Sequence, residues 1–212
     1  MMIGSKICLK FGRDKFLSSR QAVERLVERV RMATSAGANE RDGVPQLNKR
    51  QIDFIEVFRH NPARVSIVAS RVGGRPVGIT ISSLTSVSVK PPLFAISYSK
   101  GDGQSGAVRN ASHVTVNLLC QGSEDLARSF ASSDGAKFKS ERVSSRWSIN
   151  ELGLPVLKEA TSVIVGRKTD SIEVADAMLV IYQAEEVENH SEEAEGVTAT
   201  TALLYCDGKF AS

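Results

Sequence analysis

Aromatic residues, cysteines and long hydrophobic runs are all scarce in this chain of 212 residues. Aromatic residues make up only 6% of it, so the interleaved aromatic and basic surface typical of single-stranded nucleic-acid binding is not indicated. The cysteines, Cys8, Cys120 and Cys206, are scattered and odd in number, which argues against a disulfide framework and favours free thiols. The apolar runs Val65–Ala69 and Ala177–Ile181 are too short to cross a bilayer, so we expect a cytoplasmic protein without a membrane segment.

The chain also has little excess of charge of either sign, since its formal net charge is only +3. Residues 1–50 hold 11 Lys and Arg against 5 Asp and Glu, which leaves 16 against 19 for the rest of the chain. The larger part is therefore slightly acidic, which disfavours a nucleic-acid partner along its surface. The histidines, His60, His113 and His190, lack metal-ligand spacing, and we expect no metal site.

The start of the chain reads as an extension separate from the main domain. Residues Arg20–Thr34 place apolar side chains on one stripe and charged ones opposite, which predicts an amphipathic helix. The following Ser35–Asn48 is rich in Gly, Asn, Asp and Pro and reads as a linker. We therefore predict a basic helical extension and linker over 1–48 and one main domain over 49–212, which opens with a short helix at Lys49–Arg59.

The main domain reads as mainly β, with about six strands and few helices between them. Parallel strands need a helix at almost every crossover, so an antiparallel barrel fits this pattern better. Short helices are expected at Ala107–Ala111 and Glu124–Ala131, a loop at Gly101–Gly106 and a polar turn around Lys168–Ser171. The expected strands are Arg64–Ser70, which leads into a Gly73-Gly74 hairpin turn, two strands and a turn within Pro76–Tyr98, then His113–Leu119, Ser162–Gly166, Ala177–Val187 and Val197–Tyr205.

The segment Thr80–Ser88 is unusual because hydroxyl residues recur in it beside apolar ones. In a strand, Thr80 and Ser82 would line one face and Ile79 and Ile81 the other. Small hydrogen-bonding side chains beside exposed backbone suit a flat ligand with polar edges. The alternative is a Ser- and Thr-rich edge strand that simply faces water.

This segment also carries a family resemblance: Pro76–Phe94 (PVGITISSLTSVSVKPPLF) resembles the signature of the flavin reductase-like, FMN-binding split-barrel family. The resemblance covers roughly residues 50–212 and leaves the N-terminal extension outside. Further matching segments follow in the order of the family: Phe58–Ala69, Ser97–Lys100, Val114–Leu119, Leu126–Phe130, Lys137-Phe138, Leu152–Pro155 and Leu203–Phe210.

The resemblance implies a six-stranded antiparallel split β-barrel that forms a homodimer, with each flavin near the interface. It implies that flavin contacts Pro76, Val77, Gly78, Ile79, Thr80, Ser82, Ser83, Ser97, Tyr98, Ser99, Gly103, Gln104, Ser129 and Phe130. It implies that the nicotinamide nucleotide approaches Tyr205, Cys206, Asp207 and Gly208. No catalytic acid–base residues are implied, because the isoalloxazine itself carries the hydride chemistry.

The implied activity is that of an NAD(P)H:flavin oxidoreductase, which transfers hydride from NADH or NADPH to FMN or FAD and supplies a monooxygenase with reduced flavin. Two departures from the family pattern stand out. The phosphate loop Gly101–Ser105 carries a carboxylate where a phosphate needs donors, although Lys100, Ser105 or Arg109 could compensate. Ala177 stands where many members have a His beside the flavin. The alternative is therefore a non-catalytic flavin-binding or scaffold protein that docks through its N-terminal helix.

Overall fold

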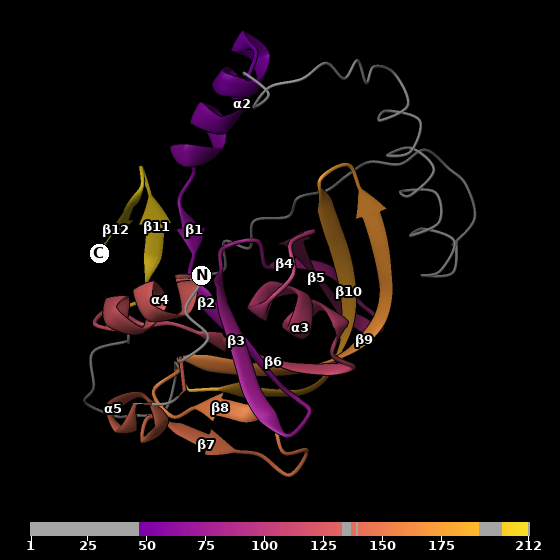
Figure 1. Ribbon diagram of the computed structural model, residues 1–212, viewed down its shortest axis with the longest axis vertical. Helices are drawn as coiled ribbons and strands as arrows, with labels where there is room; N and C mark the ends of the chain where they lie inside the picture. Colours follow the sequence, from indigo (N-terminus) through magenta and orange to yellow (C-terminus); the bar gives the residue numbers. More distant parts are fainter. Residues whose placement is uncertain (1–46, 133–136, 139, 191–200, 212) are drawn as a thin grey trace, which may run out of the picture. The chain divides into compact units, whose positions relative to one another are not determined.

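The computed structural model describes residues 47–132, 137–138, 140–190 and 201–211 (Figure 1). The helix expected at Arg20–Thr34 lies outside these residues, and the domain boundary at residue 48 stays a prediction. The elements are α2 (Lys49–Arg59), β1 (Ala63–Arg64), β2 (Ser66–Val72), β3 (Arg75–Ile81), β4 (Thr85–Val89), β5 (Pro92–Ser99), α3 (Gln104–Asn110), β6 (His113–Leu118), α4 (Glu124–Ala131), α5 (Glu141–Ser144), β7 (Trp147–Ile149), β8 (Pro155–Leu157), β9 (Ser162–Val174), β10 (Ala177–Asn189), β11 (Leu204–Cys206) and β12 (Lys209–Ala211).

The mainly-β, antiparallel fold is confirmed, and its largest part is a seven-stranded sheet in the order β3-β2-β6-β9-β10-β5-β4. Its two edge strands, β3 and β4, are joined by residues 82–84 alone. Such a link spans at most about 14 Å, whereas the edges of a flat sheet of seven strands would lie about 29 Å apart. The sheet must therefore curl until its edges approach each other, which is the geometry of a split barrel. The count of about six strands is not confirmed.

Two hydrophobic cores lie on opposite faces of this sheet because side chains alternate along each strand. On β2, Val68 points into a core with the interior residues of β3, β5, β6 and β10 and with α3. Its neighbours Ile67 and Ala69 point into a second core with α4 and the β7–β8 hairpin. Strand β2 is thus buried on both faces, and it fixes α4 relative to the barrel.

Several expected boundaries are wrong. The polar stretch Lys168–Ser171 is not a turn, because β9 continues through it and the chain reverses at Ala175-Asp176. Strands β9 and β10 form one long antiparallel ribbon within the seven-stranded sheet, and backbone pairing with β10 outweighs the polar side chains of β9 (Figure 1). The extended Pro76–Tyr98 region holds three strands rather than two. Helix α3 begins at Gln104, inside the expected loop Gly101–Gly106.

Other expected elements are confirmed. Helix α2 begins after Asn48, whose side chain forms a capping box with Gln51, and α4 occupies the expected residues. The Gly73-Gly74 hairpin turn is present, with positive φ at both glycines. The final strand expected at Val197–Tyr205 lies partly outside the described residues. Within the described part, β11 begins only at Leu204.

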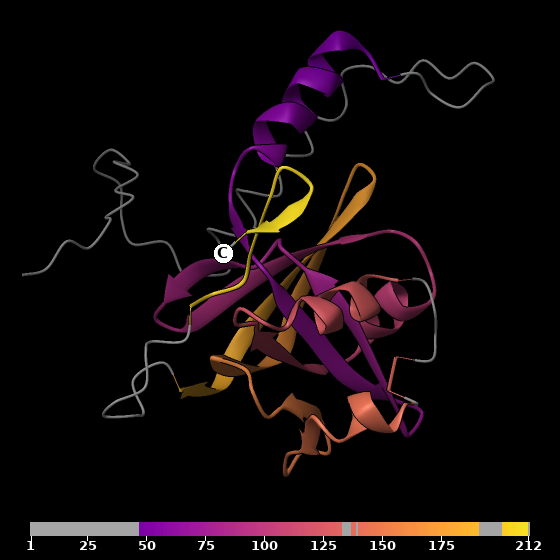
Figure 2. The same cartoon turned by 90° about the vertical axis from the view of Figure 1, so that its left-hand side faces the viewer.

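The C-terminal hairpin β11–β12 lies beside the end of α2 (Figure 2). It turns through Asp207 and Gly208, which both have positive φ, as a two-residue hairpin loop requires. The Asp207 amide donates to the Arg59 carbonyl, and the Asp207 carboxylate pairs with His60. These contacts tie the hairpin to the segment between α2 and β1.

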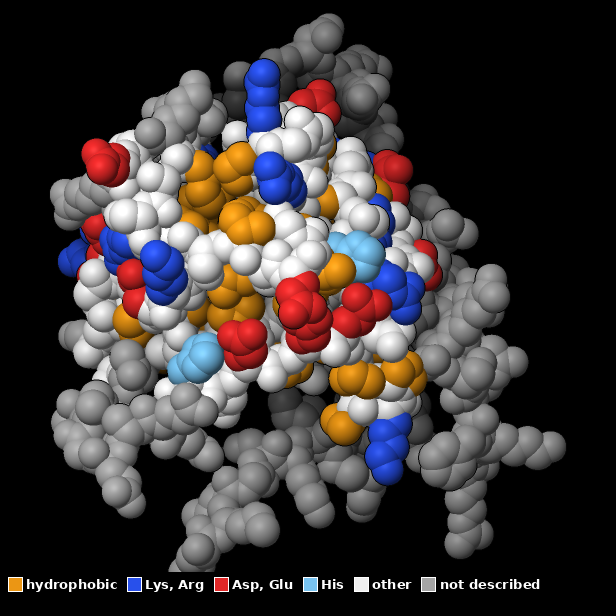
Figure 3. Space-filling view, turned by 90° about the horizontal axis from the view of Figure 1, so that it is seen from below, with side chains coloured by type: hydrophobic (Ala, Val, Ile, Leu, Met, Phe, Trp, Pro, Cys, Tyr) orange, Lys and Arg blue, Asp and Glu red, His pale blue; other side chains and the backbone are white. Residues whose placement is uncertain are grey.

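The surface seen in Figure 3 carries acidic side chains across its middle, with hydrophobic groups distributed between charged ones. This pattern agrees with the slight acidic excess counted for the main part of the chain. No helix in the described part of the chain combines the length and the apolar character needed to span a membrane.

Candidate ligand-binding cleft

The opening of the barrel holds a cleft of about 580 Å³, where the end of β3 approaches β5. This volume is within the range of about 300–1,000 Å³ usual for small-molecule sites. The cleft is lined by Ile79, Thr80, Ile81, Ser82 and Ser83 from β3 and its link, by Ser97, Tyr98 and Ser99 from β5, by Asp102, Gly103, Gln104 and Ser105 around the start of α3, and by Phe130, Ala131, Ser132 and Lys137 from α4 and beyond.

One wall of the cleft is the outer edge of β3. The Gly78 amide donates to Gln104 Oε1 at 3.2 Å, and Lys137 Nζ donates to the Gly78 carbonyl at 3.2 Å. Both backbone groups of Gly78 therefore point away from β2. Backbone groups two residues apart on a strand point the same way, so the amide and carbonyl of Thr80 face the same side. The strand edge thus presents peptide groups beside the cleft.

The apolar wall comes from α4, which packs against β3 (Figure 1). Thr80 Oγ1 donates to the Ala127 carbonyl at 2.7 Å, which fixes the helix against the strand. At the end of α4, the Phe130 ring packs against Phe138 and Trp147, with ring centroids 5.0 and 5.4 Å away. Trp147 is a packing residue of this core, and Phe130 is held rigidly where it borders the cleft.

Position 78 requires glycine because the Phe130 side chain packs closely against the backbone of β3. A Cβ at this position would lie 2.9 Å from Phe130 Cε1 and 3.3 Å from the Val68 carbonyl oxygen. Any side chain would therefore push Phe130 away from the strand. The residue bonds Gln104 and Lys137 and touches Phe130, but it does not line the cleft itself.

The opposite wall is rich in hydroxyl groups. Ser82, Ser97 and Ser99 are exposed, and Ser83 Oγ donates to the Ser97 carbonyl at 2.9 Å. The hydroxyl hydrogens of Thr80 and Ser83 are therefore used within the protein. Toward a ligand these two hydroxyl oxygens can only accept hydrogen bonds, whereas the exposed Ser82 hydroxyl can donate or accept.

Tyr98 closes the floor of the cleft from inside the barrel. Its hydroxyl lies 2.9 Å from that of Tyr182, and both side chains are buried. Burial, together with the neighbouring Tyr182, raises the pKa of Tyr98 well above its usual range, and burial raises the pKa of Tyr182 to about 12. Both hydroxyls therefore stay protonated at neutral pH and form a fixed polar pair.

The loop before α3 places Asp102 at the exposed end of the cleft, as its sequence suggested. Of the residues expected to compensate, Lys100 pairs with Glu173 and, through that hydrogen bond and its charge, lowers the pKa of Glu173. Arg109 Nη1 donates to the Ser99 carbonyl at 2.7 Å, so its guanidinium lies next to the cleft wall. Ser105 lines the cleft directly. The positive side chain beside the loop is thus Arg109 rather than Lys100.

A second cavity of about 460 Å³ adjoins the first and shares Ser82 with it. Its other lining residues are Ile55, Phe58, Arg59, Asn61, Ala63, Tyr205 and Gly208. Of the four residues expected to meet the nicotinamide nucleotide, Tyr205 and Gly208 line this cavity, and Cys206 and Asp207 do not. Burial and then the Asp207 carboxylate raise the pKa of the Cys206 thiol, which keeps it protonated.

The structure brings ten of the fourteen expected flavin-contact residues to the first cleft, and whether they bind flavin stays a prediction. Pro76, Val77, Gly78 and Ser129 do not line it. Sequence reasoning missed Ile81, Ala131, Ser132 and Lys137 as lining residues. Lys137 had a signal, because it stands in one of the segments that resemble the family, beside the apolar Phe138. Ala177 does not line the cleft, but its register partner Ser99 does.

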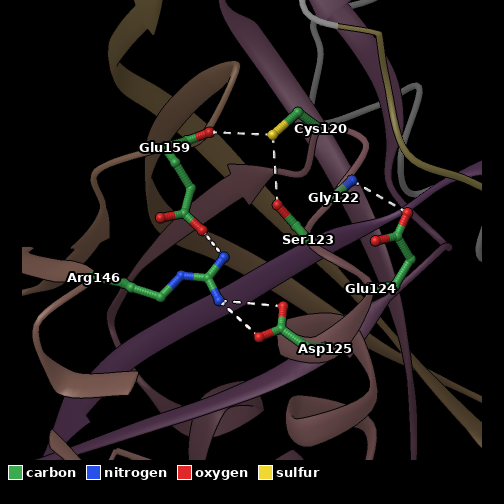
Figure 4. A network of polar contacts seen from close by, with 7 residues as sticks. All are labelled: Cys120, Gly122, Ser123, Glu124, Asp125, Arg146 and Glu159. Atoms are coloured by element: carbon green, nitrogen blue, oxygen red, sulfur yellow. Dashed lines mark hydrogen bonds and ion pairs between the residues drawn. The ribbon is translucent and has the colours of Figure 1, made fainter. Parts of the chain in front are cut away.

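Helix α4 is anchored from its other end by an arginine (Figure 4). Arg146 Nη1 donates to both carboxylate oxygens of Asp125, at 3.0 and 3.2 Å, and its Nη2 pairs with Glu159. Cys120 Sγ lies 3.5 Å from Ser123 Oγ and contacts the Glu159 carbonyl beside this network. Arg146 therefore links the start of α4 to the segments on either side of the β7–β8 hairpin.

We expect Arg146→Met to lower the free energy of unfolding by about 1–2 kcal/mol, because it removes the cation that both carboxylates share. Urea denaturation measures this loss, with Arg75→Met as the control, since Arg75 is an exposed arginine on β3. Equal stability of the two variants would show that the network does not anchor α4.

The curled antiparallel sheet defines a split-barrel protein, and the cleft at its opening has the size of a small-molecule site. The model of the flavin reductase like domain matches residues 58–212, and the chain belongs to this family. It is 33% identical over 158 residues to an NADH:FMN oxidoreductase of Rhodococcus qingshengii, which covers 74% of this chain and 79% of that protein. A structure of the NADH:FAD oxidoreductase of Streptomyces globisporus, in complex with NAD and FAD fragments, shares the fold with a TM-score of 0.67, at 23% identity over 80% of this chain and 96% of that one.

The reductase component of a 4-nitrophenol 4-monooxygenase/4-nitrocatechol 2-monooxygenase from Rhodococcus opacus is also similar. It is 33% identical over 121 residues, which cover 57% of this chain and 63% of that protein. The similar proteins thus include both an NADH:FMN oxidoreductase and the reductase component of a monooxygenase.

Proposed function

We propose that this chain is an NAD(P)H:flavin oxidoreductase that uses NADH or NADPH to reduce FMN or FAD. The observation that carries the proposal is the cleft itself. It is lined by a strand edge, a rigid aromatic side chain and a row of hydroxyl groups, and it adjoins a second cavity. The similarity to the NADH:FMN oxidoreductase of Rhodococcus supports it, because that alignment spans most of both chains.

The lining residues fit a flavin. An isoalloxazine is flat, with apolar faces and polar atoms at one edge, so it needs an apolar wall beside hydrogen-bonding groups. Phe130 supplies the wall, and the peptide groups of Thr80 at the β3 edge supply donors and acceptors. The exposed serines Ser97 and Ser99 lie where a solvated ribityl phosphate would find hydroxyl donors, with Arg109 next to them.

The bound flavin supplies the redox chemistry, and the protein has to hold two rings against each other. In this proposal Phe130 and Tyr98 exclude water from the buried end of the cleft, while the β3 edge sets the orientation of the flavin. Ser82 borders both cavities, so a nicotinamide ring held near Tyr205 and Gly208 would approach the flavin past this residue. No side-chain acid or base is needed for this arrangement.

The direct test is anaerobic bleaching of the flavin absorption at about 450 nm by the purified protein with FMN or FAD and NADH or NADPH. We expect bleaching well above the protein-free rate. Flavin binding without accelerated bleaching would favour the non-catalytic carrier, and a lack of flavin binding would contradict the proposal.

The proposal has three further parts. The chain forms a homodimer, it passes reduced flavin to a monooxygenase component, and it works in the cytoplasm. Helix α2 supports the dimer, because none of its residues is buried and Ile52, Phe54, Ile55 and Phe58 are exposed. Exposed apolar side chains in such number are typical of a surface that another chain covers. Sedimentation equilibrium of the full chain would give twice the monomer mass of 22.9 kDa.

A non-catalytic flavin-binding or scaffold protein is the second candidate, favoured by Asp102 in the cleft and by Ala177 beside its β5 wall. In that case the basic residues 1–48 would dock the protein to a partner. Removal of residues 1–48 would then abolish partner capture while flavin binding by the remaining domain persists. Unchanged capture would remove the reason for the scaffold role.

A further inference from the structure

A third cavity, of about 540 Å³, adjoins the proposed flavin cleft at the loop that precedes α3. The cleft and this cavity share Asp102 and Gly103 as lining residues. Helix α3 packs against β2 and β3, and residues of α3 and of the end of β2 line the cavity (Figure 1). A ligand whose phosphate lies at the loop can therefore extend beyond the cleft into a further space of similar size.

The junction of the two spaces carries a carboxylate that the protein itself does not use. Asp102 is exposed, and no hydrogen bond or ion pair joins its side chain to another of the described residues. A carboxylate only accepts hydrogen bonds when it is ionised. Asp102 therefore favours a ligand that places donor groups, rather than a strongly charged phosphate, at the border between the cleft and the third cavity.

A cation lies close to this carboxylate. A Cβ on Gly106 would be 3.7 Å from Arg109 Nη2 and 3.9 Å from Asp102 Oδ1, so both groups lie beside the same backbone position. Arg109 Nη1 donates to the Ser99 carbonyl, which orients the guanidinium and leaves Nη2 for a phosphate oxygen. The loop thus offers a phosphate-binding group and a hydroxyl-binding group next to each other.

FMN and FAD differ at such a junction. The phosphate of FMN is a terminal group with about two negative charges at neutral pH, which Asp102 repels. The corresponding phosphate of FAD is esterified on both sides and carries a single charge. The ribose that follows the diphosphate has hydroxyl groups, which commonly donate to a carboxylate in dinucleotide sites. The charges at the loop therefore favour the dinucleotide.

Arg71 supplies a second cation, on the β2 side of the third cavity. Its Nε donates to the Gly74 carbonyl at 2.9 Å, so its own hairpin holds the side chain in place. No carboxylate among the described residues pairs with it. A planar guanidinium stacks on aromatic rings, and the exposed Asn110 amide across the cavity can both donate and accept. These groups suit adenine, which is flat and has donors and acceptors at its edge.

We propose that the third cavity binds the adenosine half of FAD, and that this chain therefore takes FAD in preference to FMN. The inference rests on the proposed function and names the flavin that it uses. In this arrangement Arg109 binds the diphosphate, Asp102 accepts from the ribose hydroxyls and Arg71 packs on the adenine. NADH also has an adenosine half, but the residues expected to meet that nucleotide, Tyr205 and Gly208, line the other cavity.

The first test uses the wild type alone and compares the dissociation constants of riboflavin, FMN and FAD by equilibrium dialysis. We expect FAD to bind at least about tenfold more tightly than FMN, which corresponds to about 1.4 kcal/mol. Adenosine monophosphate should weaken the binding of FAD and leave that of FMN unchanged. Affinity for FMN equal to or above that for FAD would overturn the proposal, and so would a failure of adenosine monophosphate to compete with FAD. Failure to bind any flavin would instead refute the proposed function.

The second test changes Arg71. We expect Arg71→Gln to weaken FAD about tenfold without a matching loss for FMN, because FMN does not reach the third cavity. Arg75→Gln is the matched control, since Arg75 is an exposed arginine on the next strand of the same hairpin and lines neither the cleft nor this cavity. Equal losses for FMN and FAD would overturn the proposal. A higher KM for NADH with unchanged FAD affinity would assign the cavity to the nicotinamide dinucleotide and would also overturn it.

The third test changes the carboxylate and predicts effects of opposite sign, which a general loss of structure does not produce. Asp102→Asn should tighten FMN, because the repulsion of its terminal phosphate is removed, and should weaken FAD, because a strong acceptor for the ribose is lost. Asp170→Asn is the control, since Asp170 is an exposed aspartate on β9 that lines neither space. An unchanged ratio of the FMN and FAD dissociation constants in Asp102→Asn would contradict the proposed role of this residue.

Discussion

Replacement of Ser83 by tryptophan is expected to weaken flavin binding at least about 100-fold, which corresponds to about 2.7 kcal/mol. Ser83 lies in the short link between the two edge strands, lines the cleft and donates to the Ser97 carbonyl. An indole at this position would occupy the space between the β3 edge and β5 that the ring is proposed to fill. Fluorescence titration with FMN and the rate of NADH-dependent bleaching measure the loss.

The matched control is Ser86→Trp, because Ser86 is an exposed serine on β4 that does not line the cleft. Both variants should show a far-ultraviolet circular dichroism spectrum like that of the wild type. If Ser83→Trp binds flavin as tightly as Ser86→Trp does, the flavin lies elsewhere.

Replacement of Gly166 by alanine is expected to lower the free energy of unfolding by about 3 kcal/mol. Gly166 is buried on β9, and a Cβ there would lie 2.4 Å from Phe94 Cζ and 3.2 Å from Tyr182 Cβ. The rings of Phe94 and Tyr182 stack with centroids 5.2 Å apart inside the barrel, so neither can withdraw without displacing the other. The strand has to lack a side chain at this point because the two rings take up the space. We expect a midpoint of thermal unfolding about 6–12 °C below that of the wild type.

Gly101→Ala is the control for stability, since the nearest atom to its Cβ would be 3.9 Å away and its backbone does not require glycine. Calorimetry of both variants should show a large shift for Gly166→Ala and almost none for Gly101→Ala. Similar midpoints for the two would mean that the barrel interior can accommodate a methyl group beside Phe94.

Much of the architecture is predictable from the sequence because its signals are local. Asn48 with Gln51 predicts the start of α2, and Gly73-Gly74 predicts a hairpin turn, since each motif satisfies a geometric requirement within a few residues. The length of β9 is not predictable in this way. Its polar part, Lys168–Ser171, becomes a strand only through pairing with β10, and a single sequence does not reveal such pairing.

The candidate site shows the same division. Thr80, Ser82 and Ser83 stand in a contiguous segment whose pattern of hydroxyl and apolar residues is visible in the sequence. Lys137 lies in the cleft wall through tertiary hydrogen bonds to the carbonyls of Phe130 and Gly78, whereas lysine in a polar stretch of sequence ordinarily indicates solvent exposure. The hydroxyl hydrogen bonds of Thr80 and Ser83 within the protein are likewise tertiary, so the sequence could suggest their place but not their partners.

The three-residue link 82–84 between β3 and β4 has a consequence for how this family member can vary. The same residues that hold the two sheet edges together also wall the cleft and border the second cavity. An inserted residue here would relax the closure and widen the binding site at once, whereas an insertion at the Ala175-Asp176 turn would lengthen an exposed loop. Natural and engineered length changes should therefore accumulate at the tip of the β9–β10 ribbon, and the ligand preference of the cleft should evolve by substitution alone.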